Sequence, residues 1–369
     1  MSVPFNDLKR QHDILATELN DAIHRVMRSG YYILGPEVSQ FETEFATYCT
    51  SRHAIGVANG TDAIQLALLA VGVRPNDEVI TVANAGVPGT AAIIAIGAIP
   101  VFVDVDPQTR NLDPNALEVA ITSRTRAIMP VHLYGLMADM PAIMRIAAQH
   151  AIPVVEDVAQ AHGATLHGHV AGSLGAVAAF SFYPTKNLGA VGDGGAVVTN
   201  SDEIATRVKR LRQYGWERKY YTTEQRGINS RLDELQAALL RVKLRHLAAS
   251  TERRQEIAQM YAAAFATLPI SLPTIPDGYQ SVYHLYVIES DQRDALQHAL
   301  KQAGVGTDIH YPLPTHQQPV YQQFAPSTRM IHTEHLAMHV LSLPNFPELQ
   351  DGEVAHVIDA VRHALSTVL

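Results

Sequence analysis

Lys186 lies between two contrasting runs in the segment FSFYPTKNLGAVGDGGAV, residues 180–197. An apolar, strand-like run precedes it, and a run rich in glycine follows it. A lysine amine becomes a nucleophile toward an aldehyde when burial or a nearby cation lowers its pKa. Ser181 could donate to a phosphate, and the glycines would let the backbone pass close to a bulky ligand. Lys186 is therefore either a misplaced surface charge or a Schiff-base nucleophile.

A second segment, GVANGTDAIQLALLAVG, places Gly60 and Thr61 directly before a predicted helix. The first turn of a helix offers free N–H groups and the positive end of the helix dipole, and a glycine there lets an anion approach the backbone. The segment predicts a phosphate cradle. An ordinary helix cap by Asn59 is the alternative that this segment alone leaves open.

A third segment, VVEDVAQAHG, places Asp157 at the carboxyl end of a predicted strand, with Gln160 three residues later. Open parallel sheets bind ligands at this edge, and a carboxylate there can keep a ring nitrogen protonated. A helix cap or a buried salt bridge is the alternative for Asp157. An anion cradle, a carboxylate and a lysine together indicate pyridoxal phosphate (PLP).

A metal site is a further alternative, because His162, His167 and His169 follow Asp157 closely. Their spacing matches no helical ligand motif, and the last two lie in a polar turn. We therefore expect no metal.

The elements that must position these residues alternate along the chain. Short apolar runs rich in β-branched residues predict buried strands, and helical patterns separate several of them. This alternation favours an α/β fold with a mainly parallel sheet covered on both faces. The predicted strands are residues 77–82, 99–105, 126–132, 152–158, 176–182 and 195–200.

The second half of the chain changes pattern. Apolar residues follow a helical period over residues 229–268, which predicts a long helix that connects two domains. One strand, at 283–289, and helices near 291–303 and 351–368 follow, as in a small α+β domain. We expect a large cofactor-binding domain over residues 1–250 and a small C-terminal domain over 251–369.

Composition limits the class of protein. The chain has 369 residues, of which 47% are hydrophobic, enough for a large core. Its single cysteine, Cys49, excludes a disulfide within one chain, and its net charge of −8 without a basic stripe argues against nucleic acid as a partner. No apolar run is long enough to span a bilayer, and the N-terminus does not resemble a signal peptide, so a cytoplasmic location is expected.

The motifs NGTDAIQLAL, VVEDVAQAHG, FSFYPTKNLGAVGDGGAVVTN and GINSRLDELQAALLRVKLRHL together resemble the DegT/DnrJ/EryC1/StrS sugar aminotransferases. The resemblance runs from about Pro4 to the C-terminus. It implies the aspartate aminotransferase fold, with a mostly parallel seven-stranded sheet in the large domain. It also implies a PLP enzyme, cycling through pyridoxamine phosphate, that moves an amino group from L-glutamate to a keto group of a nucleotide-linked sugar.

The resemblance assigns roles residue by residue. Lys186 matches the Schiff-base lysine, Asp157 the partner of the pyridine nitrogen, and Gln160 a residue that contacts the cofactor ring. The residues that match phosphate donors are Gly60, Thr61 and Ser181. Asn229 matches an asparagine that reaches the PLP phosphate of the neighbouring subunit, which implies a homodimer with two composite sites. The residues that resemble substrate contacts are Tyr183, His310, Tyr311 and His316, for which packing at the domain interface is the alternative.

The segments PVHLYG, FYPTKNLGA and IHYPLPTHQQPVY look closest to the branch that aminates dTDP-3-keto-6-deoxyhexoses at C3. The 4-keto-sugar branch and cyclitol aminotransferases remain alternatives. Dehydratase relatives carry a histidine where this chain has Lys186, which argues against them. A regulator that binds an amino sugar without turnover is disfavoured by the intact set of Lys186, Asp157 and Ser181.

One position departs from the family pattern. Family members usually carry an aromatic residue that stacks on the pyridine ring, and the aligned residue here is Gly86. The ring face is then covered by another residue, such as Asn84 or Val87, or the loop follows a different course.

Overall fold

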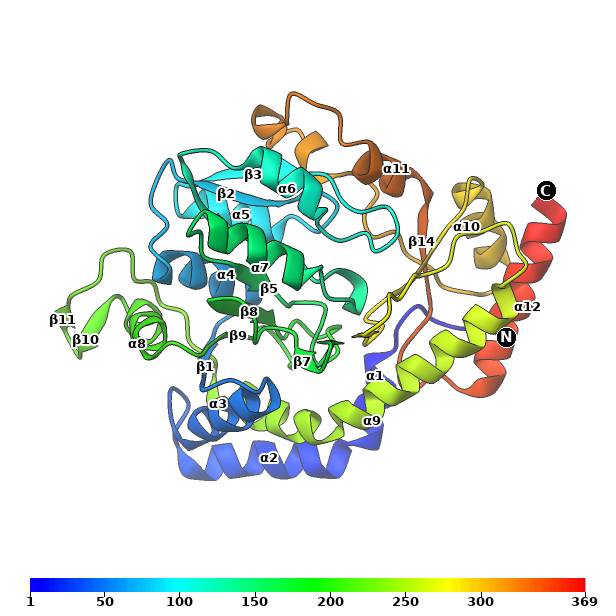
Figure 1. The fold of residues 1–369 in the computed structure, drawn as a ribbon. Helices are drawn as coiled ribbons and strands as arrows, with labels where there is room; N and C mark the ends of the chain where they lie inside the picture. The colour runs from blue at the N-terminus through cyan, green and yellow to red at the C-terminus, as the bar shows by residue number, and fades with distance from the viewer. Residues whose placement is uncertain (369) are drawn as a thin grey trace.

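The structure is a computed structural model that describes residues 1–368. Its centre is a layer of strands covered by helices on both faces (Figure 1). The strands of this layer are β1 (His53–Val57), β2 (Glu78–Val82), β3 (Ile99–Val103), β4 (Thr125–Ile128), β5 (Val155–Asp157), β8 (Val177–Ser181) and β9 (Gly195–Thr199). The six strands predicted from the sequence are confirmed; β1 was not predicted.

The layer consists of two ladders. β3, β2 and β4 pair in parallel in that order, and β1, β9, β8 and β5 form the second ladder. Isolated parallel bridges, Ile128 to Val154 and Val131 to Asp157, join β4 and its continuation to β5. The strands therefore line up as β3-β2-β4-β5-β8-β9-β1, with β9 antiparallel to both of its neighbours. The residues of β2 and β9 are all buried, as expected for strands covered on both faces.

Two apolar clusters cover the two faces. One contains Phe41 and Phe45 of α3 together with residues of α7 and α9, and the other contains residues of α4, α5 and α8. The helices of the large domain are α3 (Pro36–Tyr48), α4 (Gly60–Ala70), α5 (Pro88–Ala95), α6 (Pro114–Ala120), α7 (Met140–Gln149), α8 (Asp202–Leu211) and α9 (Glu234–Phe265). Cys49, just after α3, is buried and free.

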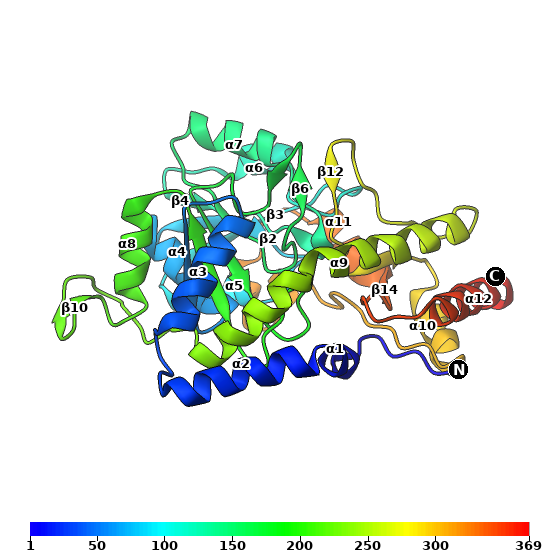
Figure 2. The ribbon, with the colours of Figure 1, turned by 90° about the horizontal axis from the view of Figure 1, so that it is seen from below.

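The long helix α9 crosses from one domain to the other (Figure 2). Leu240 and Leu247 pack into the core of the large domain, whereas Ile257 and Tyr261 belong to a separate C-terminal core. The predicted boundary after residue 250 lies inside this helix, between the two groups. The helix begins five residues later than the predicted start at 229, because Asp233 has extended backbone and Asn229 forms a bridge with Gln213.

The small domain is built on an antiparallel pair, β13 (Tyr286–Glu289) and β14 (Val340–Leu343), with α10 (Arg293–Gln302) and α12 (Asp351–Val368). Val3 packs into the same core and bridges to Val305, so the N-terminal segment lies with this domain. The N-terminus lies near α10 (Figure 2).

The remaining elements are short or peripheral. The helices are α1 (Leu8–Ile14), α2 (Ala16–Ser29), α11 (Ile331–His339) and the 3₁₀ turns η1 (Leu133–Gly135), η2 (Thr315–Gln317) and η3 (Gln322–Phe324). The short strands are β6 (Thr165–Leu166), β7 (His169–Val170), β10 (Trp216–Arg218), β11 (Tyr221–Thr222) and β12 (Tyr279–Gln280).

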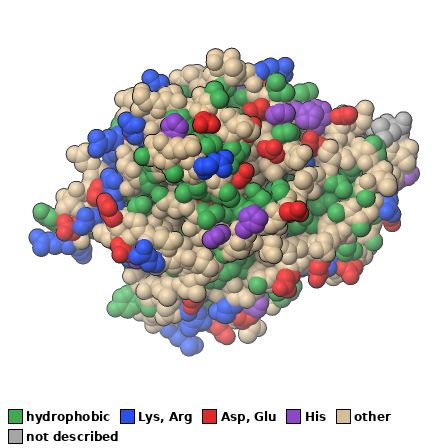
Figure 3. Space-filling view, in the orientation of Figure 1, with side chains coloured by type: hydrophobic (Ala, Val, Ile, Leu, Met, Phe, Trp, Pro, Cys, Tyr) green, Lys and Arg blue, Asp and Glu red, His purple; other side chains and the backbone are tan. Residues whose placement is uncertain are grey.

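Positively and negatively charged side chains are interspersed on the face of the molecule seen in Figure 3. Within residues 1–368, each helix is too short or too polar to cross a bilayer.

Candidate active site

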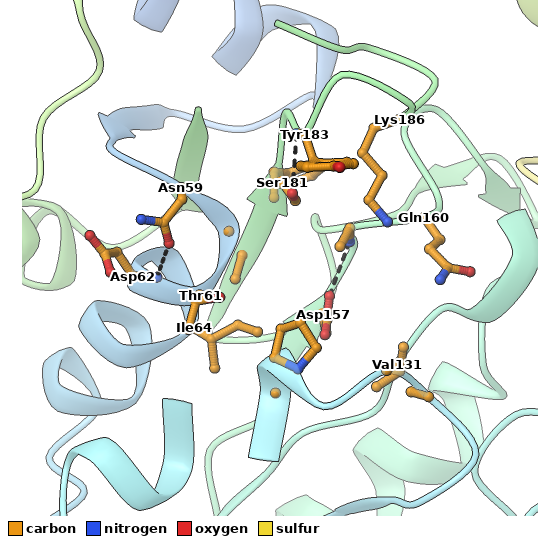
Figure 4. Close-up of a pocket in the computed structure, with 18 of the residues that line it drawn as sticks. Asn59, Thr61, Asp62, Ile64, Val131, Asp157, Gln160, Ser181, Tyr183 and Lys186 are labelled. Carbon is orange, nitrogen blue, oxygen red and sulfur yellow. Dashed lines mark hydrogen bonds between the residues drawn. The ribbon is translucent and has the colours of Figure 1, made fainter. Parts of the chain in front are cut away.

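A cavity of about 570 Å³ lies at the carboxyl ends of β5 and β8. This is the edge at which parallel sheets bind their ligands. The cavity brings together most of the residues selected from the sequence (Figure 4). Those in its lining are Gly60, Thr61, Asp157, Gln160, Ser181, Tyr183, Lys186 and Tyr311.

One end of the cavity is formed by the N-terminus of α4. Asn59 caps the helix, because its side chain accepts from the amide of Asp62 at 2.8 Å. The amides of Gly60 and Thr61 open the helix, so no preceding turn supplies acceptors for them. A Cβ added at Gly60 would lie 2.5 Å from Cβ of Ser181, so only glycine permits this close approach of helix and strand. The cap and the cradle that the sequence left as alternatives therefore coexist.

Ser181 completes this end. Its Oγ accepts from the amide of Tyr183 at 3.3 Å, which leaves the hydroxyl hydrogen available to another acceptor. The amides of residues 60 and 61, the helix dipole and this hydroxyl form a set of donors for an anion.

Asp157 lies deeper in the cavity, at the end of β5. Its amide donates to Pro130 at 2.9 Å, and its Oδ1 accepts from the amide of Ala159 at 3.0 Å. Burial raises the pKa of this carboxyl, with partial compensation from the Ala159 amide and from Lys186. A cationic ring N–H placed against the remaining oxygen would offset that desolvation.

Lys186 enters the cavity from the loop after β8, and its amide donates to Tyr183 at 2.8 Å. Its side chain extends toward Asp157 and Gln160 (Figure 4). Burial lowers the pKa of the amine from 10.5 to about 8, and Asp157 opposes this shift. A sizeable neutral fraction near neutral pH is the condition for nucleophilic attack on an aldehyde.

These residues fit pyridoxal phosphate. The donors of residues 60, 61 and 181 suit its phosphate, the buried Asp157 suits its ring nitrogen, and the amine of Lys186 suits its aldehyde. The Gly60 cradle is specific in shape, since any larger side chain would fill it.

Gln160, a buried residue in the lining of this cavity, links the two domains. Its Oε1 accepts from the amide of Tyr134 at 2.8 Å, and its Nε2 donates to the hydroxyl of Tyr311 at 3.1 Å. The hydroxyl of Tyr134 donates to the backbone oxygen of His310. Because Gln160 donates to the Tyr311 hydroxyl, that hydroxyl can direct its own hydrogen into the cavity.

The departure at Gly86 has a structural explanation. A Cβ at Gly86 would lie 3.3 Å from the ring end and hydroxyl of Tyr311, so this tyrosine occupies space that a side chain at 86 would need. Asn84 is buried and donates to the backbone oxygen of Arg110, and neither Asn84 nor Val87 lines the cavity. The two suggested replacements are therefore wrong; Gly86 and Pro88 form that wall.

Other predicted residues lie outside the main cavity. His310 lines a smaller cavity behind the loop of Lys186, and His316 is buried 3.7 Å from Glu334. Asn229 is exposed and lines a surface cavity of about 300 Å³ that shares Asp193 with the main one. Their contacts with substrate or with a partner's cofactor stay predictions.

The three histidines after Asp157 are separated. His162 is fully buried between the rings of Phe180 and Phe182, whereas His167 and His169 are exposed at the β6–β7 turn. Within residues 1–368 no group of three or more His, Cys, Asp or Glu side chains is arranged to hold a metal ion.

Some lining residues were not selected from the sequence, among them Val131, Pro88, Gly89 and Asp193. Asp193 lies in the glycine-rich run that follows Lys186, which is a signal that could have identified it. Pro88 and Gly89 start α5, and nothing in their local pattern indicates a ligand.

Comparisons with known proteins agree with this site. A family model described as the DegT/DnrJ/EryC1/StrS aminotransferase family matches residues 13–362. The chain is 48% identical over 362 residues to the dTDP-3-amino-3,4,6-trideoxy-alpha-D-glucose transaminase of Streptomyces venezuelae, covering 98% of this chain and 95% of the relative. It is 46% identical over 363 residues to the dTDP-3-amino-3,6-dideoxy-alpha-D-galactopyranose transaminase of Aneurinibacillus thermoaerophilus, covering 97% and 98%. The crystal structure of S. venezuelae DesV in complex with a ketimine intermediate matches the fold with a TM-score of 0.96, at 47% identity and 98% coverage of both chains.

Proposed function

The chain belongs to the DegT/DnrJ/EryC1/StrS aminotransferase family and is a PLP-dependent sugar aminotransferase, and from this premise we propose its reaction. We propose that it transfers the amino group of L-glutamate to C3 of a dTDP-3-keto-6-deoxyhexose. The choice of C3 is supported by the names of two relatives. Both names describe dTDP-linked 3-amino sugars, although one specifies glucose and the other galactopyranose.

The residues of the cavity account for the chemistry. PLP, when bound, supplies an aldehyde carbon and a ring that withdraws electrons from it. Asp157 holds a proton on the ring nitrogen, because a buried carboxylate is stabilised by a cationic N–H against it. The amine of Lys186 would take a proton from the reacting carbon of the donor and deliver it to the carbon that was the aldehyde of the cofactor, since its lowered pKa of about 8 suits a base near neutral pH.

A homodimer with composite sites is the second part of the proposal. The exposed side chains of Tyr31, Tyr32 and Ile33 form an apolar patch, and Ile33 lines the surface cavity that contains Asn229. Asp193 belongs to both that cavity and the main one, so the patch is continuous with the active site. A second copy that covers the patch would place polar groups at the edge of each site.

The cytoplasmic location expected from the sequence stays a prediction.

The substrate is tested with a panel of keto sugars. The purified holoenzyme is incubated with L-glutamate and each of a set of dTDP- and UDP-linked 3-keto and 4-keto sugars and a keto cyclitol, and the amino position of each product is read by NMR. We expect the highest kcat/KM with a dTDP-linked 3-keto-6-deoxyhexose. A preference for a 4-keto sugar or a cyclitol would overturn the assignment, and no turnover despite bound PLP would favour a regulator.

The composite site is tested by complementation. Lys186→Ala and Asn229→Ala chains, inactive or weak alone, are mixed under conditions that exchange subunits, and activity is measured at limiting PLP. If Asn229 acts on the partner's cofactor, one site in each heterodimer carries neither lesion and activity returns. Demonstrated heterodimers without any gain in activity would place Asn229 away from the partner's site.

A further inference from the structure

The loop that carries Lys186 borders cavities other than the active site. Thr185 lines a cavity of about 180 Å³, and Asn187 lines another of about 250 Å³, while Lys186 itself faces the main cavity. A side chain that borders a cavity has few packing neighbours on that side, so van der Waals contacts hold residues 185–187 weakly. The position of the Lys186 amine therefore depends strongly on the hydrogen bonds of this loop.

Contacts with the large domain hold the loop near its ends. The amide of Lys186 donates to the backbone oxygen of Tyr183 at 2.8 Å, and the amide of Ala190 donates to that of Phe182 at 2.8 Å. The buried side chain of Leu188 packs into the core of the large domain. The side chain of the remaining residue next to the lysine, Asn187, turns in another direction.

Asn187 ties the loop to the C-terminal part of the chain. Its Nδ2 donates to the backbone oxygen of Val282 at 3.1 Å, and its Oδ1 lies 3.0 Å from Nδ1 of His284. The first bond fixes which end of the amide faces the histidine, so Nδ1 of His284 carries the hydrogen and donates. Both side chains are buried, at 9% and 8% relative exposure, so losing either partner leaves a desolvated polar group behind.

The segment that contains His284 is itself anchored to the sheet. The amide of Val282 donates to the backbone oxygen of Gly135 at 3.0 Å, and a Cβ at Gly135 would lie 2.7 Å from the amide nitrogen of His284. The turn at Gly135 follows the bridge between Val131 and Asp157. His284 is therefore held against the same part of the sheet that presents Asp157 to the cavity.

The protonation state of His284 suits a steady donor. Burial lowers its pKa well below 6.5, and the cations of Lys186 and Arg254 lower it further. The ring is therefore neutral near neutral pH, and its single N–H is directed at Asn187.

We propose that His284 is a positioning residue for Lys186 and that it acts through Asn187. The hydrogen bond between them keeps the Lys186 amine within reach of the reacting carbon during the steps in which the amine is not bonded to the cofactor. This rests on the proposed role of Lys186 as nucleophile and base. Because a displacement of about 1 Å can cost about 100-fold in rate, one bond at the neighbouring residue can control turnover.

The experiment removes the donor and then restores it. In His284→Phe, the rate constant of the half-reaction with L-glutamate should fall about 10- to 100-fold, because the base is misplaced, while the Kd of L-glutamate changes less than about twofold. Covalent capture of PLP by the apoenzyme, fixed with borohydride, should slow as well, and this readout needs no substrate. His284→Asn should recover most of both rates, because its Nδ2 can replace Nδ1 of the histidine as donor.

Two comparisons distinguish positioning of the lysine from a general structural role. In Lys186→Ala, with methylamine added as a free base, the further change His284→Phe should leave the residual rate unchanged, because the lost bond acts through the absent lysine. Asn187→Ala should slow both reactions as His284→Phe does, and the double variant should be no slower than Asn187→Ala, because both changes remove the same bond.

His356→Phe is the matched control. It removes a different histidine hydrogen bond of the small domain, from Nε2 to the backbone oxygen of Ala303 at 2.9 Å, and should keep the wild-type rates.

Unchanged rates in His284→Phe, no recovery in His284→Asn, or a further loss in the Lys186→Ala background would overturn the proposal in favour of a purely structural histidine. If His284→Phe does not fold, Asn187→Ala decides from the side of the loop, since it removes the same bond. A wild type that captures PLP and reacts with L-glutamate but converts no keto sugar would reject the proposed sugar substrate alone.

Discussion

The amine of Lys186 should titrate near pH 8 in the enzyme stripped of its cofactor. Burial lowers this pKa from 10.5 to about 8, and Asp157 limits the shift. At pH 7.5 about a quarter of such an amine is neutral, against about a thousandth of a lysine with the ordinary value. The environment of the cavity therefore raises the concentration of the nucleophile about 200-fold at that pH.

The assay is the rate of covalent PLP capture by the apoenzyme. Saturating PLP is added at a series of pH values from about 6.5 to 9.5, a range that brackets the expected midpoint, and borohydride fixes the captured cofactor at timed intervals. The rate should rise with pH and reach half its maximum near 8. Neighbouring groups titrate outside this window, since burial lowers the pKa of His310 below 6.5 and raises that of Tyr311 to about 12.

Two variants provide the controls. Lys186→Ala should fix no cofactor at any pH. Asp157→Asn should move the midpoint to lower pH, because the carboxylate that raises the pKa of Lys186 is gone. A midpoint at 9.5 or above, or a midpoint that moves upward in Asp157→Asn, would refute the account of how burial and charge set this pKa.

The remaining predictions concern the cradle, the ring partner and the core beneath them. Asp157→Asn should retain PLP but lower single-turnover rates with L-glutamate by at least about 100-fold, and a near-normal rate would contradict its role. Gly60→Ala should raise the Kd of PLP about tenfold or more by equilibrium dialysis, because the new Cβ would lie 2.5 Å from Cβ of Ser181. Glu156→Ala should lower the free energy of unfolding in urea by about 3 kcal/mol or more, since it leaves the amides of Gly172, Leu174 and Gly175 without their acceptor and each buried unpaired donor costs about 1–3 kcal/mol; a change below about 1 kcal/mol would be inconsistent with those hydrogen bonds.

The residues that were selected from the sequence and that the cavity brings together share one property: a local signal. Gly60 and Thr61 precede an apolar helical pattern, Asp157 ends an apolar strand, and Lys186 separates a strand from a glycine run. Strand ends and helix starts are readable within a few residues, and a parallel sheet brings such ends to one edge. The cavity gathers these residues for that reason.

What surrounds the Gly86 position was misassigned, because it depends on contacts between distant segments. Tyr311 lies against both Gly86 and Gln160. In the sequence, Tyr311 and Gln160 are separated by 151 residues. The covering of the Gly86 position therefore depends on how the C-terminal domain docks on the sheet. Neighbours of Gly86 in the sequence, such as Asn84, could not supply it, because that side chain points into the core toward Arg110.

Arg253 and Arg254 show the same limit in a single dipeptide. In the sequence ERRQE the two residues are indistinguishable, and a charged pair in a helix is read as a solvated face. On α9 Arg253 is partly exposed and pairs with Asp351, while Arg254 turns under the Asn345 segment and is buried. The physical difference between them is the desolvation of one charge. Which side of a helix turn an arginine occupies depends on the packing of α9, and the local pattern of residues does not contain that information.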